Sequence, residues 1–197
     1  MVYELNNLDK LSIYKLMSNL VVPRPIAWVS TISKDKIVNV APFSYFIPLS
    51  SNPPTMLISI GHKKDGSPKD TLKNLRETKI CSIAIANTNL TKDIHNTSQP
   101  LEFNNNEFKA FNIDTKEIDP NYPPIAKGVK VAFLGKYYKE VDLEGSLTIP
   151  VVIKVDKVYV DDELIEDKDK IRLKFSDPIA RVGAKYYALG KELNIDE

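Results

Sequence analysis

Two short segments near the N-terminal end of the chain combine strand-forming residues with proline. The first reads Pro23-Arg24-Pro25-Ile26-Ala27-Trp28-Val29-Ser30-Thr31, and the second reads Asn39-Val40-Ala41-Pro42-Phe43-Ser44-Tyr45-Phe46. A proline donates no hydrogen bond to a neighbouring strand, so it belongs at a sheet edge, a strand start or a bulge. A short polar turn over 33–36 joins the two segments. We therefore predict a sheet rim whose exposed backbone meets a flat cofactor.

A second motif, Ser67-Pro68-Lys69-Asp70-Thr71, is typical of a helix start. Ser67 can cap the helix, and Pro68 fits its first turn. The same residues could also form an anion site, because free N–H groups at a helix N-terminus favour phosphate. Lys69 adds positive charge there, and the Thr71 hydroxyl can donate to a phosphate oxygen. The sequence leaves both interpretations open.

A third candidate lies near the C-terminal end, in Arg181-Val182-Gly183-Ala184-Lys185-Tyr186-Tyr187. Arg181 could meet a phosphate or a carboxylate, and the two tyrosines could stack on an aromatic ligand. The alternative is that the tyrosines pack the C-terminal segment onto the rest of the fold.

Several other chemistries find no support in the sequence. The GxxxxGK[ST], GxGxxG and GxSxG motifs are absent, which argues against a P-loop, a Rossmann site and an α/β-hydrolase elbow. His62 and His95 have no partners at metal-ligand spacing, so we expect surface histidines and no metal site. Cys81 is the only cysteine and lies in an apolar run. We interpret it as a buried strand residue rather than a reactive thiol, in a reducing compartment.

Length and charge narrow the class of protein further. The chain has 197 residues, which fits one domain over 1–197. Its formal net charge of +1 gives no support for nucleic-acid binding. Charged residues interrupt the first twenty positions, and no apolar run approaches the roughly 20 residues of a membrane span. We expect no membrane association and a cytoplasmic location.

The elements that must position the candidate residues are mostly strands. We predict strands over 26–32, 37–46, 55–60, 80–86, 129–141, 146–159 and 171–175. Helices are predicted over 8–20, 69–78, 91–99 and 106–112, with loops over 50–54 and 177–190. The strands follow one another at hairpin spacing rather than in βαβ units. This favours a mainly β fold, an antiparallel, Greek-key-like barrel with added helices.

Several motifs follow one another along the chain and form a recognisable set. In order, they are PRPIAWVST, NVAPFSYF with the loop prolines Pro53-Pro54, KDT at a helix start and R-x-G-x-x-Y. Over about 21–187 the chain resembles the flavin reductase-like, FMN-binding split-barrel family, particularly its flavoredoxin-type members. The resemblance implies a six-stranded split barrel that forms a homodimer with FMN near the interface. One departure is that Gly183 is followed by Ala184, where family members commonly have a second glycine.

The resemblance also implies roles for individual residues. A rim group would line the flavin ring: Asn39, Ala41, Pro42, Phe43 and Ser44. A first-motif group would flank the ring or its ribityl chain: Arg24, Pro25, Ser30 and Thr31. A third group would hold the phosphate end, with Asp70 orienting its neighbours: Ser59, Lys69, Asp70, Thr71 and, nearby, Arg181.

The chemistry expected of such a site is hydride transfer to the flavin N5, so no catalytic side chain is required. We hypothesise that unpaired N–H groups beside Pro42 stabilise negative charge on the reduced ring. The first functional reading is an NAD(P)H-dependent flavin reductase that passes electrons to free flavin or to a partner protein. The alternative is a non-enzymatic FMN electron carrier. A third reading is a split-barrel binding domain with an empty or different site.

Overall fold

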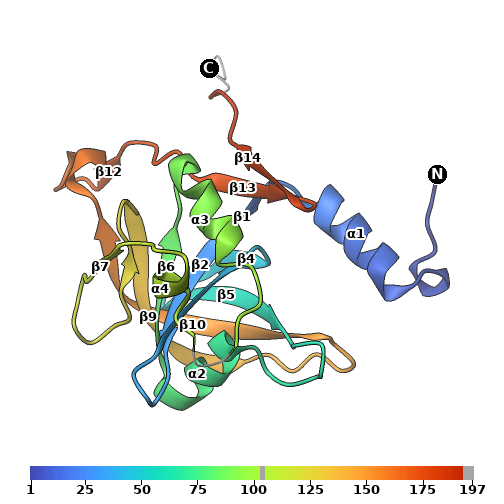
Figure 1. Cartoon of the computed structure of the whole chain (residues 1–197). Helices are drawn as coiled ribbons and strands as arrows, with labels where there is room; N and C mark the ends of the chain where they lie inside the picture. The colour runs from blue at the N-terminus through green and yellow to red at the C-terminus, as the bar shows by residue number, and fades with distance from the viewer. Residues whose placement is uncertain (103–104, 193–197) are drawn as a thin grey trace.

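A computed structural model describes residues 1–102 and 105–192 of the chain. Its main sheet consists of seven strands: β2 (Ala27–Ile32), β3 (Val38–Phe43), β4 (Phe46–Ser51), β5 (Pro54–Gly61), β6 (Ile80–Ile85), β9 (Val131–Glu140) and β10 (Thr148–Val160). Their order across the sheet is β3-β2-β6-β9-β10-β5-β4, and every neighbouring pair is antiparallel. The mainly β, antiparallel fold predicted from the sequence is confirmed (Figure 1).

The two edge strands of this sheet are consecutive in the chain. β3 and β4 are separated only by Ser44 and Tyr45, yet they stand at opposite ends of the strand order. The sheet therefore curls on itself, and the Ser59 N–H donates to the Tyr45 carbonyl at 2.9 Å beside the turn. The result is a split barrel.

Two details of this turn region differ from the sequence prediction. One strand was predicted over 37–46, but the chain turns at Ser44–Tyr45 and a new strand begins. β4 then continues to Ser51, into the predicted loop, which gives the main sheet seven strands instead of six. Pro48 does not interrupt β4 because an edge strand has one side without a neighbouring strand to hydrogen bond.

A smaller sheet, β1-β13-β14, lies beside the barrel. It contains β1 (Arg24–Pro25), β13 (Ile179–Val182) and β14 (Lys185–Ala188). The loop predicted over 177–190 was wrong, because the tail folds back as a hairpin. Gly183 permits the tight reversal: its φ is +54°, and a Cβ there would collide with the Asn19 side chain. The methyl group of Ala184, in contrast, is exposed.

Helices and short strands complete the fold. The α-helices are α1 (Lys10–Leu20), α2 (Asp70–Thr78), α3 (Thr91–Asn96) and α4 (Glu107–Ala110). The 3₁₀ turns are η1 (Leu5–Asn7), η2 (Thr88–Leu90) and η3 (Asp162–Leu164). Two small ladders pair β7 (Thr115–Lys116) with β8 (Ile125–Ala126) and β11 (Ile165–Asp167) with β12 (Arg172–Leu173). Among the described residues, no helix is long and apolar enough to cross a membrane.

Helix α1 stands away from the barrel (Figure 1). Asp9 caps its start by accepting from the N–H groups of Leu11 and Ser12 at 2.9 and 3.0 Å. The helix buries only Ser18, and several large apolar side chains on it and just after it are exposed: Leu11, Tyr14, Met17, Leu20, Val21 and Val22. Within the described part of the chain these apolar side chains therefore stay largely in contact with water, although α1 is joined to the rest of the fold through the Ser18 carbonyl and the Tyr14–Tyr45 contact.

The core lies on both faces of β2, which explains why the three residues at its start, Ala27-Trp28-Val29, are all apolar. Ala27 and Val29 pack into the barrel interior, whereas Trp28 packs against Phe108 on the opposite face. The Trp28 indole N–H donates to the Thr97 hydroxyl at 2.9 Å and so fixes the segment after α3. Cys81 is buried in β6, as predicted, and burial raises the pKa of its thiol to about 12. It is therefore a structural residue.

Candidate functional site

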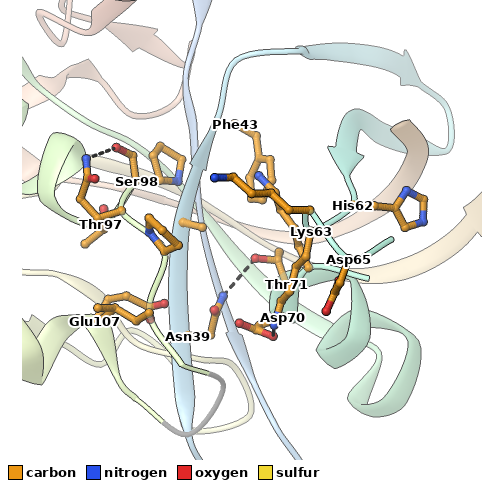
Figure 2. A pocket seen from close by; sticks show the side chains of 17 residues that line it. Asn39, Phe43, His62, Lys63, Asp65, Asp70, Thr71, Thr97, Ser98 and Glu107 are labelled. Atoms are coloured by element: carbon orange, nitrogen blue, oxygen red, sulfur yellow. Dashed lines mark hydrogen bonds and ion pairs between the residues drawn. The ribbon is translucent and has the colours of Figure 1, made fainter. Parts of the chain in front are cut away.

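Two adjoining cavities follow the free edge of β3. The first, of about 650 Å³, lies between β3, the start of α2, the 62–65 loop and the 97–101 segment. The second, of about 420 Å³, continues toward α1 and the β13–β14 hairpin. The two share Pro42, Phe43, Lys69 and Ser98. In Figure 2, Thr97, Ser98 and Glu107 lie on one side of the first cavity, and His62, Lys63 and Asp65 lie on the other.

The edge of β3 differs from the prediction in its backbone chemistry. The Val40 N–H points away from β2, since it donates to Glu107 Oε2 at 2.9 Å. In an antiparallel pair alternate residues share this direction, so the next outward position is Pro42. Proline has no N–H, and the N–H groups of Ala41 and Phe43 point toward β2. The hypothesis that the Pro42 segment supplies unpaired N–H donors is therefore wrong, because this stretch turns carbonyl groups outward.

Glu107 lies in the wall of the first cavity, and sequence reasoning missed it. Its side chain is 7% exposed, and burial raises the pKa of its carboxyl, opposed by the hydrogen bond from Val40. The contact ties α4 to the free edge of the barrel. Nothing in the local sequence marks Glu107, because its partner is a backbone group 67 positions away.

The start of α2 forms another wall. Lys69 occupies the N-cap position without a side-chain cap. The cap predicted at Ser67 was wrong, because its hydroxyl donates instead to Asp65 at 2.6 Å, within a turn that precedes the helix. Within the described chain no protein acceptor is recorded for the N–H groups of Asp70, Thr71 and Leu72. An uncapped helix start of this kind attracts anions.

Lysines dominate the charge around that helix start. Lys63 pairs with Asp70, with 2.5 Å between Nζ and Oδ1. Lys64 and Lys69 also line the cavity. Lys69 has no carboxylate within ion-pair distance among the described residues, and its ammonium lies 5.8 Å from the centre of the Phe43 ring. The exposed ammonium is thus available to a negatively charged ligand.

A buried polar network supports the wall between β2, β3 and α2. Asn39 Nδ2 donates to Thr71 Oγ1 at 3.0 Å and to Thr31 Oγ1 at 3.4 Å. Asn74 Nδ2 donates to the same Thr31 oxygen at 3.1 Å. All four side chains are at most 7% exposed. The hydrogen bond from Asn39 to Thr71 is drawn in Figure 2.

The second cavity has a different lining, rich in aromatic rings and cations. Tyr14 and Tyr45 stack with their ring centres 6.3 Å apart. The Arg181 guanidinium lies 4.4 Å from the centre of the Tyr186 ring. The described residues that line this cavity include Lys69 and Arg181 but no carboxylate. Its field is therefore positive, whereas the first cavity mixes both signs.

Arg24 lies behind the wall of the second cavity and connects the segments that surround it by hydrogen bonds. It is only 5% exposed and donates to the carbonyl of Ser18, to that of Gly183 at 3.1 Å and to the Ser44 hydroxyl at 3.4 Å. One side chain thus ties α1, the tail hairpin and the β3–β4 turn together. No carboxylate lies within ion-pair distance of Arg24 in the described part of the chain.

The structure brings most residues of the predicted site to one groove. The first cavity is lined by Asn39, Ala41, Pro42, Phe43, Lys69, Asp70 and Thr71, and the second adds Ser44, Ser59 and Arg181. Four predicted residues line neither cavity: Arg24, Pro25, Ser30 and Thr31. Pro25 is exposed in β1, and the other three are buried behind the groove. Among the described residues no group of three potential metal ligands occurs.

Comparison with known proteins places this geometry in a family. A family model described as "Flavin reductase like domain" matches residues 17–177. An uncharacterized protein of Aquifex aeolicus is 35% identical over 190 residues, which cover 95% of this chain and 94% of that protein. The uncharacterized protein YwrF of Bacillus subtilis is 28% identical over 200 residues, which cover 98% of this chain and 97% of that protein.

Solved structures agree on the fold. Nitrilotriacetate monooxygenase component B from Bacillus cereus superposes with a TM-score of 0.91 at 25% identity, covering 99% of this chain and 98% of that one. The Pseudomonas fluorescens 2-nitrobenzoate 2-nitroreductase NbaA superposes with a TM-score of 0.87 at 24% identity, covering 100% of this chain and 96% of that one. Flavoredoxin of Desulfovibrio vulgaris superposes with a TM-score of 0.76 at 16% identity, covering 99% of this chain and 97% of that one. At identities this low, the last two are evidence for the fold alone.

Proposed function

The chain belongs to the flavin reductase-like domain family, and from this premise we propose that it is an FMN-binding, NAD(P)H-dependent flavin reductase. The observation that carries the proposal is that the free edge of β3 and the uncapped start of α2 meet in one cavity. A flat ring can lie against the edge of β3, and a phosphate can bind at the start of α2. We take the domain to span residues 1–197.

The phosphate end of FMN suits the residues at the start of α2. Lys69 would supply positive charge, and the N–H groups of the first helical turn would donate to phosphate oxygens. Asp70 would not repel the anion strongly, because Lys63 pairs with it at 2.5 Å. This supports the expectation that Asp70 orients its neighbours rather than touching the ligand.

The ring end suits the edge of β3. Ala41, Pro42 and Phe43 line the cavity and offer apolar contact. When bound, the flavin supplies the chemistry by accepting a hydride and passing electrons on. The chain's own residues hold the ring, exclude water on the barrel side and keep β3 in place through Glu107. No side chain is assigned a catalytic role.

The second cavity is where we expect the nicotinamide donor or the final acceptor to approach. Lys69 and Arg181 lie there without a lining carboxylate, which favours phosphate groups of NADH or NADPH. The structural likeness to a monooxygenase component B supports delivery of electrons to free flavin or to a partner oxygenase. We place this activity in the cytoplasm.

We further propose that the protein forms a homodimer through α1. Leu11, Leu20 and Val21 are 60%, 74% and 58% exposed, which favours burial against a second copy. Light scattering on the wild-type protein and on a Leu20→Lys variant tests this. A dimer that becomes a monomer in the variant supports the proposal, and a monomeric wild type contradicts it.

The activity is tested by mixing FMN-loaded protein with NADH or NADPH in the absence of oxygen. Rapid loss of the flavin absorbance band with one donor supports the reductase. Loss of the band with neither donor would favour the electron carrier instead. A folded protein that takes up no flavin would contradict both and favour a split-barrel binding domain with a different site.

A further inference from the structure

The hydrogen bonds around Thr71 determine which way its hydroxyl can donate. Thr71 Oγ1 accepts from Asn39 Nδ2 at 3.0 Å. A threonine hydroxyl has a single hydrogen, and that hydrogen stays available when the oxygen serves as an acceptor. In the described part of the chain no protein acceptor is recorded for it. Thr71 lines the first cavity but is only 1% exposed, so a ligand in the cavity is the partner this hydrogen can reach.

The Asn39 amide presents its nitrogen to two threonine hydroxyls. Its two hydrogens have two acceptors, the hydroxyl oxygens of Thr71 and Thr31. Asn74 Nδ2 donates to the same Thr31 oxygen. Thr31 thus receives two donors, and both lone pairs of its oxygen are in use. Thr31 and Asn74 hold Asn39, and Asn39 in turn holds Thr71.

We propose that Asn39 is a positioning residue that turns Thr71 into a hydrogen-bond donor for an anionic oxygen at the start of α2. This inference rests on the proposed function, in which that oxygen belongs to the FMN phosphate. It changes the role expected for Asn39 from contact with the flavin ring to action through Thr71. Thr71 adds a buried donor to the N–H groups of the first turn of α2, a helix of nine residues.

The geometry explains why the polar network is buried behind the cavity wall. A hydroxyl that can rotate freely can donate in several directions or accept instead. The Asn39 donor removes that freedom before the ligand arrives, which is preorganisation of the kind that raises affinity. The proposal therefore predicts that Asn39 affects the binding of phosphate-bearing flavin far more than that of phosphate-free flavin.

The test compares FMN with riboflavin, which lacks the phosphate, by titration of the full chain. The variants are Thr71→Val, which removes the hydroxyl at similar volume, Asn39→Leu, which removes the donor, and the double variant. Each single change is expected to weaken FMN binding about tenfold or more, with a much smaller effect on riboflavin. Thr71→Ser, which keeps the hydroxyl, should retain most of the preference for FMN.

The double variant distinguishes positioning from independent contact. If Asn39 acts through Thr71, adding Asn39→Leu to Thr71→Val should cost little further FMN affinity. Losses that multiply would overturn the proposal, as would an unchanged ratio of FMN to riboflavin affinity in either single variant. Ser82→Ala, which removes a buried hydroxyl bonded to the Pro123 carbonyl outside the groove, is the matched control and should leave both affinities unchanged.

Two further outcomes separate this inference from the proposed function. A wild-type protein that binds neither FMN nor riboflavin refutes the flavin site itself. A wild-type protein that binds both equally well keeps the flavin site and refutes the oriented donor. If Asn39→Leu does not fold, as judged by its thermal unfolding, the comparison of Thr71→Val with Thr71→Ser decides: equal FMN affinities would overturn the proposal.

Discussion

The two cavities along β3 are held in place by different means. Buried polar contacts from several elements fix the wall of the first: the Asn39 network, the Glu107–Val40 bond and the Trp28–Thr97 bond. The second is lined by half-exposed rings and depends on Arg24 for its connections. A site fixed from several sides suits a resident cofactor, and a site with fewer constraints suits a ligand that exchanges.

Arg24→Met should have the largest effect, because the second cavity depends on it. The change removes the donors to two carbonyls and a hydroxyl. The Ser18 carbonyl keeps its hydrogen bond from the Gly183 N–H, whereas the Gly183 carbonyl loses the side-chain donor that Arg24 supplies. We expect a loss of about 3 kcal/mol in the free energy of unfolding, or roughly 6–12 °C in melting temperature. Arg76→Gln is the control, since Arg76 is exposed and its bidentate pair with Glu140 should contribute less than about 1 kcal/mol. Equal losses in the two variants would show that Arg24 has no special structural role.

Lys69→Met tests the anion end of the first cavity. The methionine stem can still pack on Phe43, but the charge is lost. FMN affinity should fall about tenfold at low salt, and the difference from wild type should shrink as ionic strength rises. Riboflavin affinity should change little. Lys92→Met, on the exposed face of α3, is the control; a loss of the same size there would mean that general surface charge, not Lys69, attracts the ligand.

Glu107→Gln tests the carboxyl that holds the edge of β3. Burial raises the pKa of this carboxyl above its usual range, so folding favours the protonated form. Its contribution to stability is fully present below the unfolded pKa and is lost as pH rises through the folded value. Glutamine can still accept from Val40 and carries no charge. The variant should therefore gain stability relative to wild type at pH 7, and the gain should vanish near pH 4 in thermal unfolding.

Tyr186→Phe should have the smallest effect. The Tyr186 hydroxyl is buried, and no partner is found for it among the described residues. Removing it therefore loses no hydrogen bond, while the ring can still pack against Arg181 and His95. The free energy of unfolding should change by less than about 0.5 kcal/mol. A larger loss would reveal a partner, and the second cavity would then be more firmly built than we describe.

Local sequence patterns were sufficient for most strands of the main sheet. Apolar runs such as 80–86 predicted their strands, and the proline in 38–43 correctly marked an edge. Patterns failed where a distant partner decides the outcome. The Ser67 hydroxyl donates to Asp65 and therefore does not cap α2. Gly183, packed against Asn19, allows a hairpin where a loop was predicted. Glu107 and Arg24 each bond a backbone group far along the chain, at Val40 and at Gly183, which no local spacing reveals.

The most direct test of the account is a titration of the purified, flavin-free protein with FMN and with riboflavin, followed by flavin fluorescence. We expect saturable binding of both, with FMN bound at least tenfold more tightly because of Lys69, Thr71 and the start of α2. A folded protein that leaves the fluorescence of added FMN unchanged would contradict the claim that the first cavity is a flavin site.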